Sequence, residues 1–306
     1  MKRIVITGGA GFIGSHLVEF YQDQAEIVIL DNFRSGHKKN LDGLKCRLVE
    51  GSILDRDLVG EVVRGADVIF HLAALVSVPE SMGAPVETVD INVRGLLNVL
   101  EGARTAGVRK LCFASSAAVY GENPEQPKVE TMTPDPRSPY AITKLDGEYY
   151  CALYSREGWL ETAALRFFNV FGPRQDPNGA YAAAVPIFLQ KALRNEPVTI
   201  FGDGGQTRDF IYVKDIVGAL AFVAGTQGLT GVFNAGYGEC ISIAELARTI
   251  LKASNSQSEL HFAPERLGDI RHSQSSPAKL LDAGWIPEYG LVPGLEATVR
   301  AFSEAP

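Results

Sequence analysis

Residues 3–14 of the chain read RIVITGGAGFIG. The first five are mostly β-branched, which is typical of a buried parallel strand, and a helical pattern follows the glycines. Gly8 would permit a tight turn, Gly11 would let the backbone approach a pyrophosphate, and Gly14 would let the helix pack closely on the strand. The amino end of that helix would favour an anion. The stretch therefore predicts the first strand, turn and helix of a dinucleotide-binding sheet.

A second apolar strand is expected at Glu26–Leu30, and it ends in Asp31. This is about the spacing at which an acidic residue binds the adenosine ribose hydroxyls of a dinucleotide. A carboxylate there would repel a ribose phosphate, so NAD is favoured over NADP. The alternative, that Asp31 is a turn or cap residue, is disfavoured by the glycines before it.

The alternation of strands and helices continues along the first half of the chain. Further strands are expected near residues 46–49, 67–70, 110–115 and 162–167, and helices near residues 13–21, 55–63 and 85–105. This rhythm predicts an α/β fold with a doubly wound parallel sheet (Rossmann), whose ligand lies beyond the carboxyl ends of the strands. HLAA at 71–74 and Ser115-Ser116 each follow such a strand.

Ser138–Lys144 reads SPYAITK and is expected to start a long helix at Pro139. Tyr140 and Lys144 would then lie one turn apart on one face. A neighbouring ammonium group favours phenolate and should lower the pKa of Tyr140 toward neutral pH. Such pairs are common on ordinary helices, so the prediction of an acid/base pair depends on Ser116 and the glycine motif nearby.

Composition limits the class of protein. The 306 residues are 46% hydrophobic with a formal net charge of -7, which predicts a soluble globular chain and disfavours nucleic acid or a membrane surface as partner. The cysteines Cys46, Cys112, Cys151 and Cys240 are scattered, so reduced thiols in a cytoplasmic protein are expected, without disulfides or a metal site. No signal peptide is expected, and no window reaches the roughly 20 apolar residues of a membrane span.

Several motifs, in order along nearly the whole chain, carry a family resemblance: TGGAGFIG at 7–14 with Asp31, HLAA at 71–74, Asn92, SSAAVYG at 115–121, YAITK at 140–144, RFFNVFGPR at 166–174 and GDGGQTRDFIYVKD at 202–215. Together they resemble the extended short-chain dehydrogenase/reductase family, and within it the nucleotide-sugar 4-epimerases of the NAD-dependent epimerase/dehydratase group. RQDPNGAYAA at 174–183 and GDIRHSQ at 268–274 resemble the UDP-glucose and UDP-N-acetylglucosamine 4-epimerases.

The resemblance implies an isomerase that passes through a transient 4-keto sugar and keeps NAD bound. Tyr140 would take the proton from the sugar 4-hydroxyl, Ser116 would hydrogen-bond that oxygen, and Lys144 would bind the nicotinamide ribose. The implied NAD contacts are Gly8, Gly11, Phe12, Ile13, Asp31, Asn32, Ser35, Gly36, Ser52, Ile53, Leu72, Ala73, Ala74, Asn92, Ser115, Tyr140, Lys144, Phe167 and Val170. Ser52 stands where many epimerases have an adenine-binding aspartate.

The second half of the chain should hold the UDP-sugar. The implied substrate contacts are Ser77, Ser116, Ala117, Tyr140, Asn169, Ala183, Ala184, Phe201, Arg208, Arg266, Asp269 and Ser273. Arg208 and Arg266 would face the phosphates, since the planar guanidinium donates in pairs. The expected domains are 1–168 for NAD, with a returning segment near 210–236, and a smaller α/β nucleotide-sugar domain of 169–209 and 237–306. Strands at Phe210–Val213 and Val232–Asn234 should rejoin the first domain.

Alternative activities are weighed by single positions. A similar 4,6-dehydratase would have an Asp-Glu pair where Ala117 and Ala118 stand, and a UDP-glucuronate decarboxylase usually has a glutamate where Ala118 stands. A UDP-glucuronate 4-epimerase remains open, whereas a non-enzymatic NAD-sensing protein would typically lose the Tyr140 and Lys144 pair. A small Ser273 should leave room for an N-acetyl group, so both plain and acetamido UDP-hexoses are expected substrates.

A homodimer is expected by analogy with the family, through helices near 85–105 and 140–156. The residues proposed for that interface are Leu96, Leu97, Leu100, Leu145, Tyr149 and Leu153. The alternative is that they pack on their own sheet.

Overall fold

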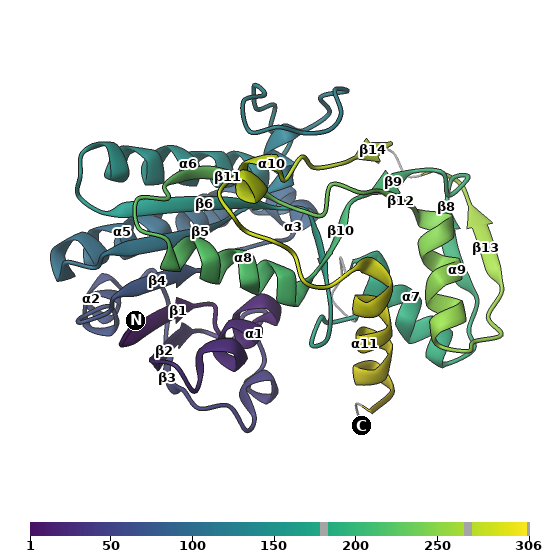
Figure 1. The fold of residues 1–306 in the computed structure, drawn as a ribbon, viewed down its shortest axis with the longest axis horizontal. Coiled ribbons are helices and arrows are strands. Elements are labelled where there is room, and N and C mark those ends of the chain that lie inside the picture. Colours follow the sequence, from purple (N-terminus) through teal and green to yellow (C-terminus); the bar gives the residue numbers. More distant parts are fainter. Residues whose placement is uncertain (178–182, 266–270, 305–306) are drawn as a thin grey trace. The chain divides into compact units, whose positions relative to one another are not determined.

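The structure is a computed structural model that describes residues 1–177, 183–265 and 271–304 (Figure 1). It contains two compact units. The first comprises Met1–Gly121, Glu130–Phe167 and Val217–Asn234. The second comprises Glu122–Val129, Phe168–Ile216 and the chain from Ala235 onward.

The first unit is built on a seven-stranded sheet in the order β11-β6-β5-β4-β1-β2-β3. Its strands are β1 (Arg3–Thr7), β2 (Glu26–Asp31), β3 (Arg47–Glu50), β4 (Val68–His71), β5 (Lys110–Ser116), β6 (Glu161–Phe167) and β11 (Gly231–Ala235). The ladders from β3 through β6 are parallel. The sequence order reverses between β1 and β4, which is the switch point where a doubly wound sheet binds its ligand. The predicted fold class is confirmed.

The helices of the first unit lie beside this sheet (Figure 1). They are α1 (Phe12–Tyr21), α2 (Arg56–Val62), α3 (Val78–Gly83), α4 (Pro85–Val89), α5 (Gly95–Ala106), α6 (Pro139–Arg156) and the later part of α8 (Val213–Gly225). Helix α6 starts as predicted, because Pro139 occupies its first turn and the Ser138 hydroxyl accepts a hydrogen bond from the Ala141 N–H at 3.2 Å.

The single helix expected near 85–105 is interrupted. A π-helical turn at Asp90–Arg94 separates α4 from α5. The turn places Asn92 so that its side chain bonds both main-chain groups of Leu75 and the Thr143 hydroxyl. A buried amide with three partners stabilises this irregular backbone. Long-range hydrogen bonds of this kind produce no periodic pattern in the local sequence, so the turn was not predicted.

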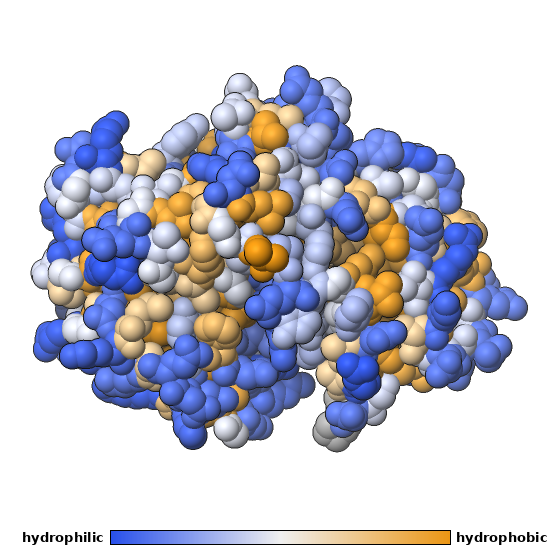
Figure 2. Space-filling model, viewed as in Figure 1, coloured by the Kyte–Doolittle hydropathy of each residue, from blue (hydrophilic) through white to orange (hydrophobic). Residues whose placement is uncertain are grey.

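One core cluster of the first unit lies between the sheet and helices α2, α5 and α6. Leu96 and Leu100, two of the residues expected at a dimer interface, are fully buried in it. The alternative that they pack on their own sheet is therefore right for these two positions. Figure 2 shows hydrophilic and apolar residues mixed over the visible face.

The second unit combines small sheets with helices. Its elements are β7 (Asn169–Phe171), α7 (Ala184–Leu193), β8 (Val198–Phe201), β9 (Thr207–Arg208), β10 (Phe210–Tyr212), β12 (Ile241–Ser242), α9 (Ile243–Ala253), β13 (Leu260–Ala263), β14 (His272–Ser273), α10 (Ala278–Asp282) and α11 (Leu291–Glu304). They form the sheets β10-β7, β12-β9-β14 and β13-β8.

Two segments belong to this second unit although the sequence placed them in the first. Phe210–Tyr212 pairs with β7 instead of returning to the large sheet, because its parallel partner begins directly after β6. Residues 122–129 join through main-chain bonds of Lys128, whose N–H donates to Gln274 and whose carbonyl accepts from Ser276, both at 2.8 Å. Throughout the described ranges, no helix is both long and apolar enough to cross a membrane.

Candidate active site

The glycine turn after β1 has the geometry that the sequence predicted. Gly8 adopts a left-handed φ of 75°, and a Cβ there would lie 2.7 Å from the Ala73 backbone nitrogen. A Cβ on Gly14 would collide with the Gly8 carbonyl. Gly11 caps α1 without a side-chain hydrogen bond, so the first N–H groups of the helix are left for an anion. This cradle fits the pyrophosphate of a dinucleotide.

Asp31 ends β2 beside this turn. Its Oδ2 accepts a hydrogen bond from the Ala10 N–H at 2.9 Å and its Oδ1 accepts one from the Phe33 N–H at 2.8 Å. The buried carboxylate is therefore fixed in orientation, with lone pairs remaining on both oxygens for hydroxyl donors. Gly36 lies against Ala10, whereas Asn32 and Ser35 are exposed.

A buried hydrogen-bonded pair lies under the ends of β1 and β4. Thr7 Oγ1 is 2.8 Å from His71 Nδ1 and accepts a longer bond, 3.4 Å, from the Ala73 N–H. Burial, together with the smaller effect of the Lys144 charge, lowers the pKa of His71 to about 3. His71 is thus neutral at working pH. Leu72, Ala73 and Ala74 follow it as half-buried residues.

Tyr140 and Ser116 lie together at the end of β5 and the start of α6. The Ser116 hydroxyl hydrogen-bonds the Tyr140 phenol and also accepts from the Ala118 N–H at 3.2 Å. The main-chain N–H of Tyr140 donates to Ser81 Oγ on α3 at 3.2 Å. Burial raises the pKa of the phenol, and the Ser116 bond lowers it.

Lys144 extends its buried ammonium group toward β5. Nζ donates to the Ala114 carbonyl at 2.7 Å and lies 4.9 Å from the Phe113 ring centroid and 5.8 Å from that of Tyr140. Burial lowers the pKa of Lys144 to about 8, opposed by the nearby Cys151 and Glu148. The expectation that Lys144 lowers the pKa of Tyr140 is therefore wrong for the protein alone, because burial of the phenol raises that pKa and the Lys144 ammonium group donates to the Ala114 carbonyl.

A buried polar network lies behind these three residues, and no role was predicted for it from the sequence. The Ser115 hydroxyl donates to Glu148, which forms a bidentate ion pair with Arg166 at 2.8 and 2.7 Å. The Arg166 guanidinium lies 4.7 Å from the Tyr120 ring, and the Tyr120 hydroxyl donates to Asn234 Oδ1 at 2.6 Å. Glu148 lies four residues after Lys144, one helical turn onward, and this spacing was the available signal.

Other predicted NAD contacts lie in the same unit with structural partners. The Ser52 hydroxyl accepts from the Leu54 N–H at 3.2 Å, and Ile53 is buried against Gly95. Asn92 uses its amide on Leu75 and Thr143, as described above. Phe12 and Ile13 start α1, and Phe167 ends β6 half-buried.

Two predicted substrate contacts of the first unit start short helices. Ser77 caps α3 by accepting from the Glu80 N–H at 3.1 Å. Ala117 begins the 3-10 turn Ala117–Tyr120.

The second unit brings some of the predicted substrate residues together. Arg208 on β9 is the register partner of Ser273 on β14. The Asn169 amide donates to the Asp209 carbonyl at 2.9 Å. Phe201 ends β8, Ala184 starts α7 and Ala183 caps it. Val170, which was predicted to contact NAD, lies on β7 in this second unit. Arg266 and Asp269 lie outside the described residues.

Asp209, which the sequence passed over, organises this part of the second unit. Its buried carboxylate accepts from the N–H groups of Tyr237 and Gly238 at 2.9 Å, and from the N–H and hydroxyl of Ser275. Burial raises the pKa of Asp209, and these bonds oppose the rise. Asp209 therefore fixes the strand that carries Arg208. Among the described side chains, no three His, Cys, Asp or Glu residues gather as metal ligands would.

Comparison with known proteins gives a consistent result. The model of the NAD dependent epimerase/dehydratase family matches residues 4–236. A UDP-glucose 4-epimerase from Mycolicibacterium smegmatis is 40% identical, with 98% of each chain covered.

Solved structures agree. A UDP-N-acetylglucosamine 4-epimerase from Methanobrevibacter ruminantium, in complex with UDP-N-acetylmuramic acid, matches with a TM-score of 0.95 and 37% identity, covering 99% of this chain and 98% of that one. A UDP-glucose 4-epimerase from Thermus thermophilus, in complex with NAD, matches with a TM-score of 0.91 and 38% identity, covering 99% of this chain and 100% of that one.

Proposed function

Because this chain belongs to the NAD dependent epimerase/dehydratase family, we propose that it is an NAD-dependent isomerase that inverts C4 of UDP-hexoses. The substrates are UDP-glucose and UDP-galactose, together with UDP-N-acetylglucosamine and UDP-N-acetylgalactosamine. The observation that carries the proposal is the cluster of Ser116, Tyr140 and Lys144 in the unit that holds the glycine turn and Asp31.

Tyr140 is the group that moves the proton. Its phenolate oxygen accepts the proton of the sugar 4-hydroxyl as the C4–O bond becomes a carbonyl, and Ser116 donates a hydrogen bond to the same sugar oxygen. When bound, NAD supplies the acceptor and then the donor for the hydride at C4. The 4-keto sugar turns its other face, and Tyr140 returns the proton to the oxygen. No net oxidation results, so the cofactor need not be exchanged between turnovers.

Lys144 supplies the positive charge that a phenolate needs. The ammonium group is charged below a pKa of about 8, and it lies on the same helix face as Tyr140. Burial holds the phenol protonated in the protein alone. The charge of Lys144 and that of an oxidised nicotinamide therefore act in the same direction, toward the phenolate.

The residues of the first unit fit NAD. The glycine cradle accepts the pyrophosphate, and Asp31 offers a fixed carboxylate to the adenosine ribose hydroxyls. The half-buried Ala73 and Ala74 leave room beside the strand ends.

The second unit holds the UDP part. Arg208 contacts the phosphates, Asn169 binds on the diphosphate side and Phe201 lies near uracil. Arg266 and Asp269 have the same assignments as in the sequence prediction. Ser273, paired in register with Arg208, is small enough to leave space for an N-acetyl group.

The absence of acidic residues at Ala117 and Ala118 disfavours elimination and decarboxylation. Ser116 leads directly into the turn that holds these two alanines, and neither methyl group can transfer a proton. Epimerisation needs only the proton transfer that Tyr140 performs.

The test is incubation of purified protein with a panel of UDP-sugars, UDP-glucuronate included, without added NAD. Chromatography should show C4 epimers of both UDP-hexose pairs. Products of dehydration or decarboxylation, or turnover of UDP-glucuronate alone, would contradict the proposal. Bound NAD without turnover of any sugar would favour a cofactor-sensing protein.

Substrate range is tested at one position. Ser273→Tyr should lower kcat/KM for the acetamido sugars by about 100-fold and leave that for the plain hexoses within a few fold. Equal losses on both pairs would show that Ser273 does not set the size of the sugar pocket.

The protein is a cytoplasmic homodimer in this proposal. Support for the dimer comes from exposed apolar side chains on α3, α4 and α6, helices that pack beside one another in the first unit. They are Met82, Val86, Val89, Ile142 and Tyr149. Support for the compartment comes from four cysteines that are all free.

A further inference from the structure

Arg34 joins the loop after β2 to two helices that follow β4. Its Nη1 lies 2.5 Å from Glu87 Oε1 on α4, and its Nη2 lies 2.8 Å from Glu80 Oε1 on α3. All three side chains are exposed, so none is needed to fill the core. One planar guanidinium thus holds two carboxylates from separate helices.

The order of strands shows which part of the sheet the ion pairs of Arg34 cross. β1 lies between β4 and β2 in the sheet. A link from the loop after β2 to helices after β4 therefore passes over the carboxyl end of β1. That end carries the glycine turn at Gly8 and Gly11, the switch point where the dinucleotide binds.

The loop that carries Arg34 is anchored at both ends to the glycine turn. The Ala10 N–H donates to Asp31 at one end, and the Ala10 carbonyl accepts from the His37 N–H at 3.0 Å at the other. The loop is therefore fixed to one side of the binding crevice, and the ion pairs of Arg34 fix it to the other.

The conformation between these anchors is specified locally. Phe33 adopts a left-handed φ of 58°, which is rare for a bulky side chain and persists only where the surroundings impose it. The Asn32 side chain accepts from the Arg34 N–H at 3.2 Å, and Lys38 lies over the Phe33 ring. The loop thus directs Arg34 away from its own strand.

We propose that Arg34, Glu80 and Glu87 form a strap that retains bound NAD. The proposal rests on the proposed function, because that function needs the reduced cofactor to stay bound until the hydride has been returned to the sugar. A dinucleotide held in the cradle can leave only after both ion pairs break or the loop lifts from the crevice. An exposed ion pair adds little to stability, but one that closes over a ligand acts on the rate of its release.

The experiment measures release of NAD from purified protein, without any turnover. Protein loaded with NAD is diluted into an excess of NAD-free buffer, and the nucleotide still bound is determined over time after rapid gel filtration. Arg34→Gln and the double variant Glu80→Gln with Glu87→Gln should each release NAD about tenfold faster than the unaltered protein. High salt should speed release from the unaltered protein and change these variants little.

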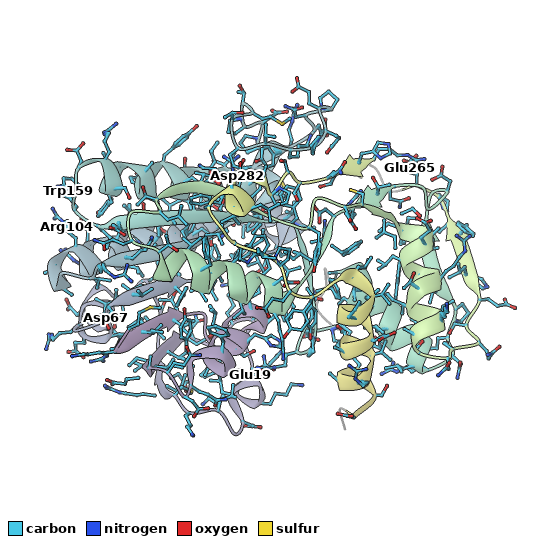
Figure 3. All side chains as sticks on the ribbon, viewed as in Figure 1. Glu19, Asp67, Arg104, Trp159, Glu265 and Asp282 are labelled. Carbon is cyan, nitrogen blue, oxygen red and sulfur yellow. The ribbon has the colours of Figure 1, made fainter. Side chains whose placement is uncertain are left out.

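Arg104→Gln is the matched control. Arg104 forms an exposed ion pair with Glu101 at 2.8 Å and lies over Trp159 near the end of α5 (Figure 3). That end leads into the amino end of β5, whereas the glycine turn follows the carboxyl end of β1. Because the two strands run in the same direction, Arg104 lies at the opposite end of the strands from the glycine turn. Release from this variant should match that of the unaltered protein.

Charge reversal separates a strap from a direct contact between Arg34 and the cofactor phosphates. Arg34→Glu should release NAD faster, and adding Glu80→Arg and Glu87→Arg should restore slow release. Failure of the reversed set to restore it, or unchanged release from Arg34→Gln, overturns the strap while leaving the proposed function intact. Unaltered protein that binds no NAD and epimerises no UDP-sugar overturns both.

Discussion

The chemistry of Tyr140 is decided by its immediate neighbours. Burial raises the pKa of the phenol, and the Ser116 hydrogen bond works against that rise. Lys144 is a turn away but donates its hydrogen bond to the Ala114 carbonyl. The phenol is therefore protonated at rest, and the proposed reaction must supply extra positive charge to make it a base.

Tyr140→Phe should remove the base and leave the cofactor site. We expect kcat to fall about 10³-fold, within the range that general acid–base groups contribute, with bound NAD retained at the usual amount. Turnover assays and nucleotide content of the same preparation measure both. Near-normal turnover would show that another group takes the proton, and loss of NAD would show that the phenol serves binding.

His71 should make the first unit sensitive to acid. Its pKa is lowered to about 3 in the folded protein and is near 6.5 when unfolded, so the unfolded chain binds more protons between these values. Stability should therefore fall as pH falls below about 6.5, by up to about 1.4 kcal/mol per pH unit.

The urea unfolding midpoints of the unaltered protein and of His71→Asn, each measured at pH 6.5 and pH 5, test this prediction. Asparagine offers Thr7 both a donor and an acceptor and does not titrate. The unaltered protein should lose more stability on acidification than the variant. Parallel losses would mean that other groups carry the acid sensitivity.

At the scale of elements, the close approach of α6 to β5 places the reactive side chains. Gly147 lies on the buried side of α6, and a Cβ there would stand 2.6 Å from Cε1 of Phe113 and 3.1 Å from Leu96. Phe113 in turn lies under the Lys144 ammonium group. A glycine one turn after Lys144 thus sets how near the helix lies to the strand.

Gly147→Ala should therefore destabilise the protein by about 1–3 kcal/mol, although alanine is the better helix former. Displacement of Phe113 should also lower kcat more than it raises KM, because the Lys144 ammonium group loses its contact with the Phe113 ring. Urea unfolding and steady-state kinetics measure the two effects.

Gly60→Ala is the control for Gly147. Gly60 lies in α2, and a Cβ there would meet nothing within 4 Å. This variant should be stabilised by up to about 1 kcal/mol with unchanged kinetics. Stabilisation of Gly147→Ala to the same degree would contradict the packing argument.

At the scale of the whole molecule, the first unit leaves an apolar face on neighbouring helices. Val86 on α4 is 75% exposed, and Met82 on α3 and Tyr149 on α6 are each 61% exposed. Leu96 and Leu100, by contrast, complete the core. A second copy of the chain would cover these exposed side chains if the homodimer forms as proposed.

Val86→Glu combined with Tyr149→Glu should shift such a dimer to monomer, because burying two carboxylates without partners is costly. Light scattering after size-exclusion chromatography measures the mass. Ile286→Glu is the control, since Ile286 is equally exposed in the second unit. A monomeric unaltered protein, or a dimer that survives both substitutions, would contradict the proposed interface.

The sequence by itself determined the sheet, and it predicted Ser116, Tyr140 and Lys144 as the reactive residues. Glycine spacing, apolar strands and the preference of Pro139 for a first helical turn act over a few residues, so Gly8, Asp31 and the start of α6 follow from local rules. The same local reasoning placed Tyr140 and Lys144 on one face.

Tertiary structure alone decided how those residues behave. The pKa of Tyr140, the Glu148–Arg166 pair and the π-helical turn at Asn92 depend on partners far along the chain. The ion pairs of Arg34 with Glu80 and Glu87 depend in addition on the order of strands in the sheet, which brings the loop after β2 near the helices after β4. Desolvation and long-range hydrogen bonds have no sequence period, because they arise only when distant segments pack together.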